Sequence, residues 1–174
     1  MARIEYADIN AEKIKPLSAR IVAERGQMLH IYRMLLHSPA VADGWLALMT
    51  AIRQRCMVPG DLRELVIMRI AQLNGAAYEA EQHHAFALKE GVSEAQLAEL
   101  EDWENSKLFS PVQRAVLDYT DNMTLDVKVP DKVFAEVRRR FDEQGLVELT
   151  ATIASYNMVS RLLVALEVEG SDKV

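Results

Sequence analysis

The sequence predicts an all-α fold with seven to nine helices, on three observations. Apolar side chains recur at helical spacing, and no stretch shows the strict apolar–polar alternation of a β-strand. Only 7 glycines and 5 prolines occur in 174 residues, and Ala, Leu, Glu and Arg, which favour helices, are abundant. Residues typical of helix starts and ends also occur along the chain, and they predict the bounds of each helix.

Length and composition restrict the kind of protein. A chain of 174 residues, half of them hydrophobic, suggests one domain over residues 1–174, with an N-terminal arm at 1–10 and a core at about 38–168. A net charge of −6 and the lack of a basic patch argue against a nucleic-acid partner. The single cysteine, Cys56, excludes an intrachain disulfide and a CxxC redox pair. Arg3, Glu5 and Asp8 stand where a signal peptide would be apolar, so we expect a cytoplasmic protein.

Start and stop residues define the expected helices. Two capping boxes, beginning at Ser93 and Ser110, each place Gln three residues after the Ser. Pro16 is expected to kink the first helix, Asp61 to cap the fourth, and Gly145 to stop the eighth. The expected ranges are 11–24, 28–37, 39–56, 61–74, 76–90, 93–100, 111–123, 132–144 and 146–168.

The last expected helix, at 146–168, is the longest apolar stretch of the chain. It nevertheless carries Glu148, Asn157 and Arg161 together with several Ser and Thr residues. A membrane span would be more uniformly apolar, so we expect a helix buried in the core or at a subunit interface.

The segment Arg63–Gly91 holds the densest group of chemically active side chains, and it is expected to form a central helix hairpin turning at Asn74 and Gly75. Glu64 lies ten residues before Asn74 and His83 nine after it. With a rise of about 1.5 Å per residue, both would lie at nearly the same height, roughly 14–15 Å from the turn. Glu79 is four residues before His83 and therefore on the same helix face.

These residues carry a resemblance to a known family. The segments RELVIMRIAQLNGAAYEAEQHHAFALKEGVS and LVELTATIASYNMVSRLL resemble the carboxymuconolactone decarboxylase family, which shares its fold with the AhpD-type alkylhydroperoxidases. The peroxidase branch has a Glu, eleven residues, CxxC, three residues and a His. Glu64 and His83 match the Glu and the His, but the two cysteine positions fall on Ala76 and Glu79. The chain thus resembles the branch that lacks the redox pair, and thiol peroxidase activity is disfavoured.

The resemblance implies an AhpD-like helical bundle that assembles as homotrimers or homohexamers. It implies a cofactor-free decarboxylase, or a related lyase or isomerase, acting on a small lactone or carboxylic acid of aromatic catabolism. His83 would be the general acid/base, Glu79 would orient it or transfer a second proton, and Glu64 would support it from the facing helix. The alternative is a non-catalytic oligomeric binding or scaffold protein on the same fold.

Other interpretations of these residues stay open. Glu64 could instead complete a capping box with Asp61. The Glu79–His83 pair could be an ordinary surface pair. His84 could replace His83 in the site, or be a partly buried structural histidine.

Two arginines and a metal site complete the candidates. Arg69 and Arg161 lie in apolar helices, where each could bind a substrate carboxylate or form an internal ion pair. A metal site from Glu79, His83 and His84 lacks the HExxH spacing. We therefore expect neither a metal nor a cofactor.

Overall fold

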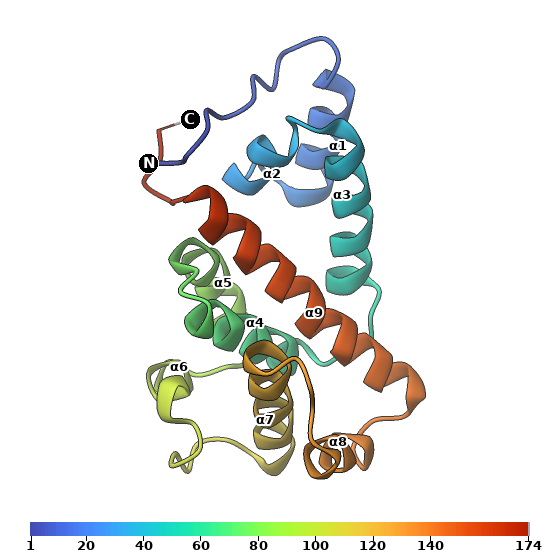
Figure 1. Cartoon of the computed structure of the whole chain (residues 1–174), viewed down its shortest axis with the longest axis vertical. Helices are drawn as coiled ribbons and strands as arrows, with labels where there is room; N and C mark the ends of the chain where they lie inside the picture. Colours follow the sequence, from blue (N-terminus) through green and yellow to red (C-terminus); the bar gives the residue numbers. More distant parts are fainter. Residues whose placement is uncertain (174) are drawn as a thin grey trace. The chain divides into compact units, whose positions relative to one another are not determined.

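A computed structural model describes residues 1–173, which form nine α-helices, one short 3₁₀ helix and no β-strand (Figure 1). The all-α prediction is confirmed. The elements are α1 (Lys15–Arg25), α2 (His30–Leu35), α3 (Pro39–Gln54), α4 (Gly60–Leu73), α5 (Ala77–Lys89), α6 (Glu94–Ala98), η1 (Leu100–Asp102), α7 (Pro111–Leu125), α8 (Asp131–Arg138) and α9 (Glu143–Leu166).

The chain divides into two compact units, which are described separately. The first unit contains Met1–Arg55 and the residues from Ala165 on, and the second contains Cys56–Val164. The single domain expected over residues 1–174 stays a prediction.

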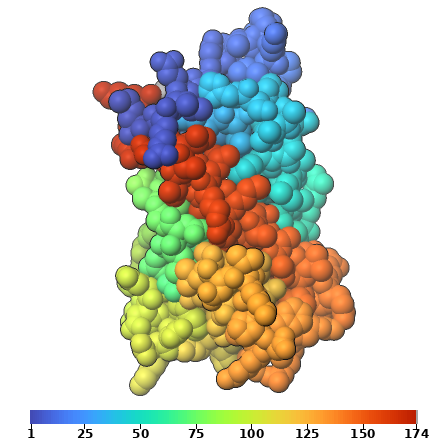
Figure 2. Space-filling view, viewed as in Figure 1, coloured from blue at the N-terminus to red at the C-terminus, as the bar shows by residue number. Residues whose placement is uncertain are grey.

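The first unit joins α1–α3 to the two ends of the chain. The backbone N–H of Arg3 donates to the carbonyl of Leu166 at 2.9 Å, and the Tyr6 hydroxyl donates to Asp172 Oδ2 at 2.5 Å. These bonds hold the extended N-terminal arm beside the C-terminal tail, as Figures 1 and 2 show in dark blue and red. The N-terminal segment predicted as an arm is therefore hydrogen-bonded to the C-terminal residues.

The expected kink at Pro16 is absent. Helix α1 begins at Lys15, so Pro16 stands in its first turn. The first backbone N–H groups of a helix have no partner within it, and a proline there removes no hydrogen bond. The prediction of a kinked helix from residue 11 was wrong because Pro16 starts the helix.

The second unit is built around α4, which packs against α5 on one side and α7 on another and also contacts η1. A turn at Asn74 and Gly75 connects α4 to α5, and Gly75 has a φ of 66°. This left-handed conformation strains residues that carry a Cβ, which explains the glycine. The core beside α4 consists of Leu65, Ala87, Val92, Leu100, Trp103, Phe109 and Leu117.

Helix termini in this unit follow the sequence signals only in part. The capping boxes at Ser93 and Ser110 are confirmed, because each Ser side chain accepts the backbone N–H of the Gln three residues later. Asp61 is not an N-cap. Helix α4 begins at Gly60, with Pro59 at the capping position, and Asp61 instead accepts a hydrogen bond from Gln113 Nε2 at 3.1 Å.

The expected helix at 132–144 was also wrong, because α8 ends at Arg138 and α9 begins at Glu143. Asp142 Oδ1 accepts the Gly145 N–H at 2.8 Å, which is the bond of an N-cap. Gly145 therefore lies in the first turn of α9 rather than at the end of α8.

Helix α9 is, among residues 1–173, the one helix long and apolar enough to cross a membrane by length and composition. Half of its most apolar window, which has a mean hydropathy of 1.3, is buried inside the protein. A core helix passes the same test of length and composition.

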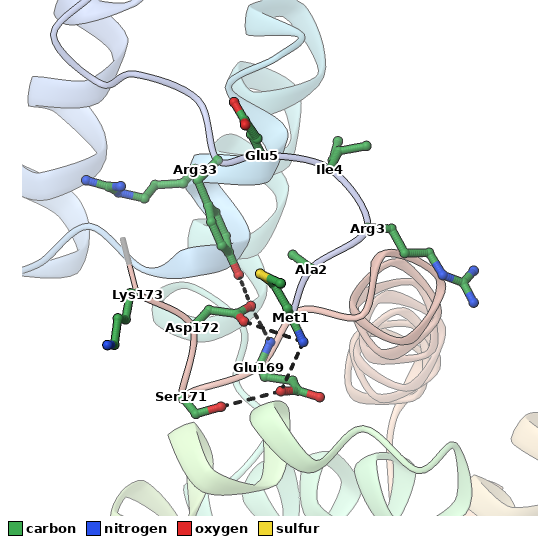
Figure 3. A pocket seen from close by; sticks show the side chains of 11 residues that line it. Met1, Ala2, Arg3, Ile4, Glu5, Arg33, Glu169, Ser171, Asp172 and Lys173 are labelled. Atoms are coloured by element: carbon green, nitrogen blue, oxygen red, sulfur yellow. Dashed lines mark hydrogen bonds and ion pairs between the residues drawn. The ribbon is translucent and has the colours of Figure 1, made fainter.

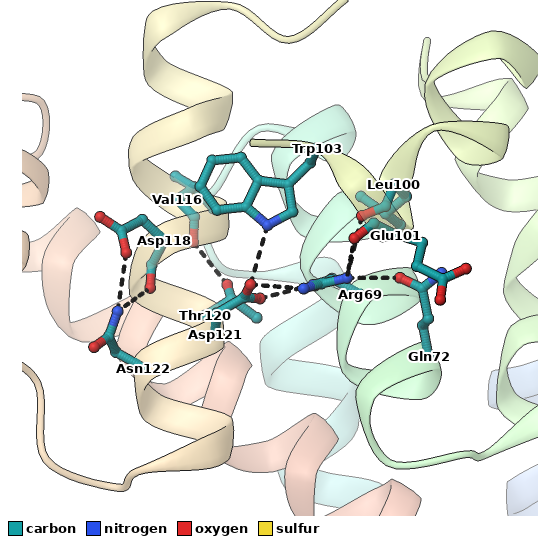
Figure 4. Close-up of polar contacts among 10 residues, drawn as sticks. All are labelled: Arg69, Gln72, Leu100, Glu101, Trp103, Val116, Asp118, Thr120, Asp121 and Asn122. Carbon is teal, nitrogen blue, oxygen red and sulfur yellow. Dashed lines mark hydrogen bonds and ion pairs between the residues drawn. The ribbon is translucent and has the colours of Figure 1, made fainter. Parts of the chain in front are cut away.

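An ion pair inside the second unit ties α4 to α7 (Figure 4). Arg69 of α4, 8% exposed, donates from Nε and Nη2 to the two carboxylate oxygens of Asp121, both at 2.7 Å. Its Nη1 donates to the Leu100 carbonyl at 3.2 Å, and Trp103 Nε1 donates to Asp121 at 3.0 Å. Of the two interpretations of Arg69, the internal ion pair is the one found.

This pair gives a stability prediction. Asp121→Ala should destabilise the protein by roughly 3–5 kcal/mol, because it leaves the guanidinium of Arg69 buried without its anion. Urea unfolding followed by circular dichroism measures the change. Asp126→Ala is the matched control, since Asp126 is exposed just past the same helix, and it should change stability by less than about 0.5 kcal/mol. Equal losses in the two variants would contradict a structural role for the ion pair.

Candidate active site

Glu64 and His83 meet inside the hairpin of α4 and α5. Glu64 Oε2 lies 2.7 Å from His83 Nδ1, and the two residues are only 1% and 7% exposed. The nearly equal spacing of the two residues from the turn brings them to the same height. A hydrogen bond between an ionised carboxylate and a histidine ring is strong and directional, and it fixes the orientation of the ring.

The carboxylate of Glu64 has a second partner on its own helix. Arg63 Nε donates to Glu64 Oε1 at 3.3 Å, and Arg63 Nη2 lies 3.5 Å from Glu90 Oε1. The capping-box alternative for Glu64 is wrong, because Asp61 does not cap α4.

Gly60 makes room for the side chain of Glu90, which is the other partner of Arg63. A Cβ built on Gly60 would lie 1.8 Å from Glu90 Oε2, so any larger residue there must displace the Glu90 side chain. The absence of a side chain at residue 60 thus lets Glu90 lie against the start of α4, within reach of Arg63.

Glu79 has different surroundings from those expected. It is 2% exposed, and Ser160 Oγ of α9 donates a hydrogen bond to its Oε2. Its Oε1 has no hydrogen-bond partner among residues 1–173. Burial raises the pKa of Glu79 to about 8, against the smaller lowering effect of the Ser160 hydrogen bond. His83 is therefore oriented by its hydrogen bond with Glu64, while Glu79 retains its proton at neutral pH.

Helix α9 contributes two side chains that the sequence analysis did not single out. The ring of Tyr156 meets the ring of His83 edge to face, with centroids 5.3 Å apart and an interplanar angle of 89°. Ser160, one helical turn later, bonds Glu79. Their i, i+4 spacing on a largely apolar helix is the signal that could have identified them.

The other candidates lie apart from this pair. His84 is partly exposed and lies 3.2 Å from Glu94. Arg161 is exposed and donates to Asn157 Oδ1 at 2.7 Å. Burial, and then the negative charge of Glu148, raises the pKa of the half-buried Cys56 thiol.

Within residues 1–173, no group of three or more His, Cys, Asp or Glu side chains could hold a metal ion. A hollow of about 670 Å³ lies in the first unit between the two chain ends, lined by residues that include Arg33, Glu169 and Asp172 (Figure 3). A smaller one of about 320 Å³ lies over α4 and α5, lined by residues that include Met68, Gln72 and Ala80. Neither is lined by His83.

Known proteins provide a context for this site. The profile of the carboxymuconolactone decarboxylase family matches residues 39–122. The protein YdfG of Bacillus subtilis (strain 168) is 31% identical over 113 residues, which cover 64% of this chain and 77% of YdfG.

Two solved structures are similar in fold. An AhpD core, a peroxidase-related protein from Ralstonia eutropha JMP134, has a TM-score of 0.82 at 16% identity, covering 98% of this chain and 93% of that one. The debrominase Bmp8 has a TM-score of 0.76 at 17% identity, covering 92% and 87%. These two structures support the AhpD-like fold.

The raised pKa of Glu79 gives a pH prediction. The folded protein holds this proton between pH 4.5 and about 8 while the unfolded chain does not, so stability should fall as pH rises through that window. Glu79→Gln should remove this loss and be more stable than the wild type at pH 8, by roughly 5 kcal/mol at most, but not at pH 4. Urea unfolding across this pH range is the measurement.

Glu81→Gln is the matched control, because Glu81 is exposed on the same helix and its substitution should leave the pH dependence unchanged. A Glu79→Gln advantage that is the same at pH 4 and pH 8 would contradict a buried, protonated Glu79.

Proposed function

This chain belongs to the carboxymuconolactone decarboxylase family, and from that premise we propose that it is a cofactor-free decarboxylase or a related lyase or isomerase. Its substrate would be a small lactone or carboxylic acid, such as those of aromatic catabolism. The observation that supports this proposal best is the buried Glu64–His83 hydrogen bond of 2.7 Å. Such a pair provides a proton donor and acceptor of fixed orientation.

Thiol chemistry does not fit the residues of this chain. With one cysteine, Cys56, the chain has no CxxC pair, and Ala76 and Glu79 stand at the positions of the two cysteines. Peroxide reduction through a disulfide needs two thiols. The hairpin would instead support proton transfer by His83, which is hydrogen-bonded to the buried Glu64.

The proposed reaction uses that proton transfer. Loss of CO₂ leaves an electron pair that the unsaturated lactone can delocalise, and His83 would protonate the carbon from which the carboxylate departed. Glu64 would hold the imidazole ring through Nδ1 and stabilise its protonated form, so the exchanged proton would travel on the other ring nitrogen, Nε2. Glu79 would act as a second acidic group on the same helix face.

The proposal also includes the compartment, the oligomeric state and the independence from cofactors. The protein would act in the cytoplasm as a homotrimer or homohexamer and would need no metal or cofactor. A non-catalytic binding or scaffold role on the same fold is the second candidate. The burial of an ionisable pair favours the enzyme, because a scaffold has no need to desolvate a carboxylate and a histidine together.

A substrate screen with matched variants tests the proposal. The wild-type protein should release CO₂ from at least one member of a panel of lactone acids and β-keto acids. His83→Ala should lower kcat at least 100-fold, because general acid catalysis is typically worth about 10²–10⁴-fold. His84→Ala should keep the wild-type rate, since His84 bonds Glu94 away from the hairpin interior.

Circular dichroism and melting temperatures would show whether the variants remain folded. Full turnover by a folded His83→Ala protein would remove His83 from the mechanism. The lack of any turnover by the wild type across the panel would favour the scaffold.

A further inference from the structure

Two buried acids of the same hairpin differ in the charge beside them. Glu64 and Glu79 are 1% and 2% exposed, and burial favours the protonated form of a carboxyl group. Burial raises the pKa of Glu79 to about 8, and the hydrogen bond from Ser160 opposes this only in part. Glu64 instead accepts a hydrogen bond at 3.3 Å from Arg63, whose guanidinium group is always positively charged. This charge favours the ionised form of Glu64.

The contact between Arg63 and Glu64 is unusual because the two residues are adjacent in α4. Side chains one position apart in a helix point about 100° away from each other and do not normally face one another. Arg63 nevertheless bends so that its Nε reaches Glu64 Oε1, and its side chain is 13% exposed. An arginine on a helix surface normally extends its charged end into water, so a second contact is needed to hold this bend.

Glu90, at the end of α5, provides this second contact. Its Oε1 lies 3.5 Å from Arg63 Nη2, and its side chain is 38% exposed. Its Oε2 would lie 1.8 Å from a Cβ at residue 60. The φ of Gly60 is not positive, so the backbone there does not require glycine, and glycine is a poor helix former. The space that it leaves for Glu90 accounts for a glycine at the start of α4.

We propose that Arg63 is a positioning residue that keeps Glu64 ionised and thereby places a proton on Nδ1 of His83. Glu90 holds Arg63 in the bent conformation that this requires. An ionised carboxylate can only accept hydrogen bonds, so the Nδ1 atom 2.7 Å from Glu64 Oε2 is the donor. Nε2 is then the ring nitrogen that gains or loses a proton. The inference rests on the proposed function, because it concerns the histidine that would transfer protons there.

The charge of Arg63 also affects the pH at which His83 Nε2 takes up its proton. Arg63 and His83 contact different oxygens of Glu64, so the carboxylate bridges them. Proton uptake makes the imidazole ring positive, and the guanidinium across the carboxylate opposes it. Without Arg63, the ring would bind its second proton more tightly and would stay positively charged at higher pH.

Other titratable groups surround these contacts. Glu79 lies one helical turn before the histidine on α5, and Tyr156 of α9 meets the imidazole ring edge to face. Burial, and then Glu148, raises the pKa of the Cys56 thiol, while the charge of Arg63 lowers it. All four groups are unchanged in the variants described below, so a shift that these variants share reports the contact that they remove.

Nitrogen NMR of the histidine side chains tests the proposal without any substrate. The chain has four histidines, and His83→Gln identifies the signals of His83. In the wild type Nδ1 should carry a proton throughout the titration, and Nε2 should titrate. Arg63→Met replaces the guanidinium with an apolar side chain, and it should raise the midpoint of the Nε2 titration by about one pH unit. Arg63→Lys keeps the charge and should restore most of the difference.

A matched control separates this effect from a general loss of surface charge. Glu94→Gln removes an exposed carboxylate that pairs with His84, and it should leave the His83 midpoint unchanged. An unchanged midpoint in a folded Arg63→Met protein would overturn the proposal. A wild-type ring that carries its proton on Nε2 and none on Nδ1 would overturn it as well.

Gly60→Ala tests the outer contact without changing any charge. The added methyl group displaces Glu90 from its place beside Arg63, and the backbone accommodates alanine. The His83 midpoint should rise by less than in Arg63→Met, because the guanidinium then spends part of its time in water. A midpoint that stays the same or falls would overturn the role of Glu90. This variant keeps the proposal testable even if Arg63→Met does not fold.

The two proposals can fail separately. The pH profile of CO₂ release should move in Arg63→Met by the same amount as the NMR midpoint, while KM changes less than about twofold, because Arg63 acts through Glu64. If the midpoint moves but no compound in the panel loses CO₂, the positioning role stands and the decarboxylase proposal fails. If CO₂ is released and the midpoint is unchanged in Arg63→Met, the decarboxylase stands and the positioning role is overturned.

Discussion

The constraint on which this structure depends is the burial of three ionisable side chains in one helix hairpin. Glu64, Glu79 and His83 are each at most 7% exposed, and removing them from water is costly unless each is compensated. The hairpin compensates them in two ways. Glu64 pairs with His83 across the helices, whereas Glu79 keeps its proton and takes a hydrogen bond from Ser160. Glu64 therefore orients the histidine ring, and Glu79 is the acid that keeps its proton.

Helix α4 carries a structural ion pair on one face and a residue of the candidate site on another. On one face Arg69 donates two hydrogen bonds of 2.7 Å to the carboxylate of Asp121, and it also donates to the backbone carbonyl of Leu100 in η1. Every charge there is matched, which is typical of a structural ion pair. On another face Glu64 reaches α5. Glu79 of α5 is buried with one carboxyl oxygen that has no hydrogen-bond partner within residues 1–173, and such an oxygen is more common in a site than in a scaffold.

The sequence allowed the hairpin to be predicted because its geometry is local. Helical rise and the spacing on either side of Asn74 and Gly75 determine the heights of Glu64 and His83, whatever the rest of the chain does. Ser160 was missed because it lies 81 residues from Glu79, and Asp121 is likewise 52 residues from Arg69. Such partners depend on tertiary packing, which periodicity does not report. The predictions for Asp61 and Gly145 were wrong because both helices begin earlier than expected. Pro59 stands at the capping position of α4, and Asp142 caps the start of α9.

The burial of Glu79 should also affect the rate at which this group exchanges its proton with water. A carboxyl group that is 2% exposed and bonded to Ser160 can exchange its proton with water only when the contact between α5 and α9 opens. Local openings of this kind occur over microseconds to seconds, far more slowly than the protonation of an exposed acid. After a sudden change of pH, the charge state of Glu79 should lag behind that of the surface, at a rate equal to the opening rate of the two helices. The rate of proton exchange at Glu79 would thus measure how often the contact between α5 and α9 opens.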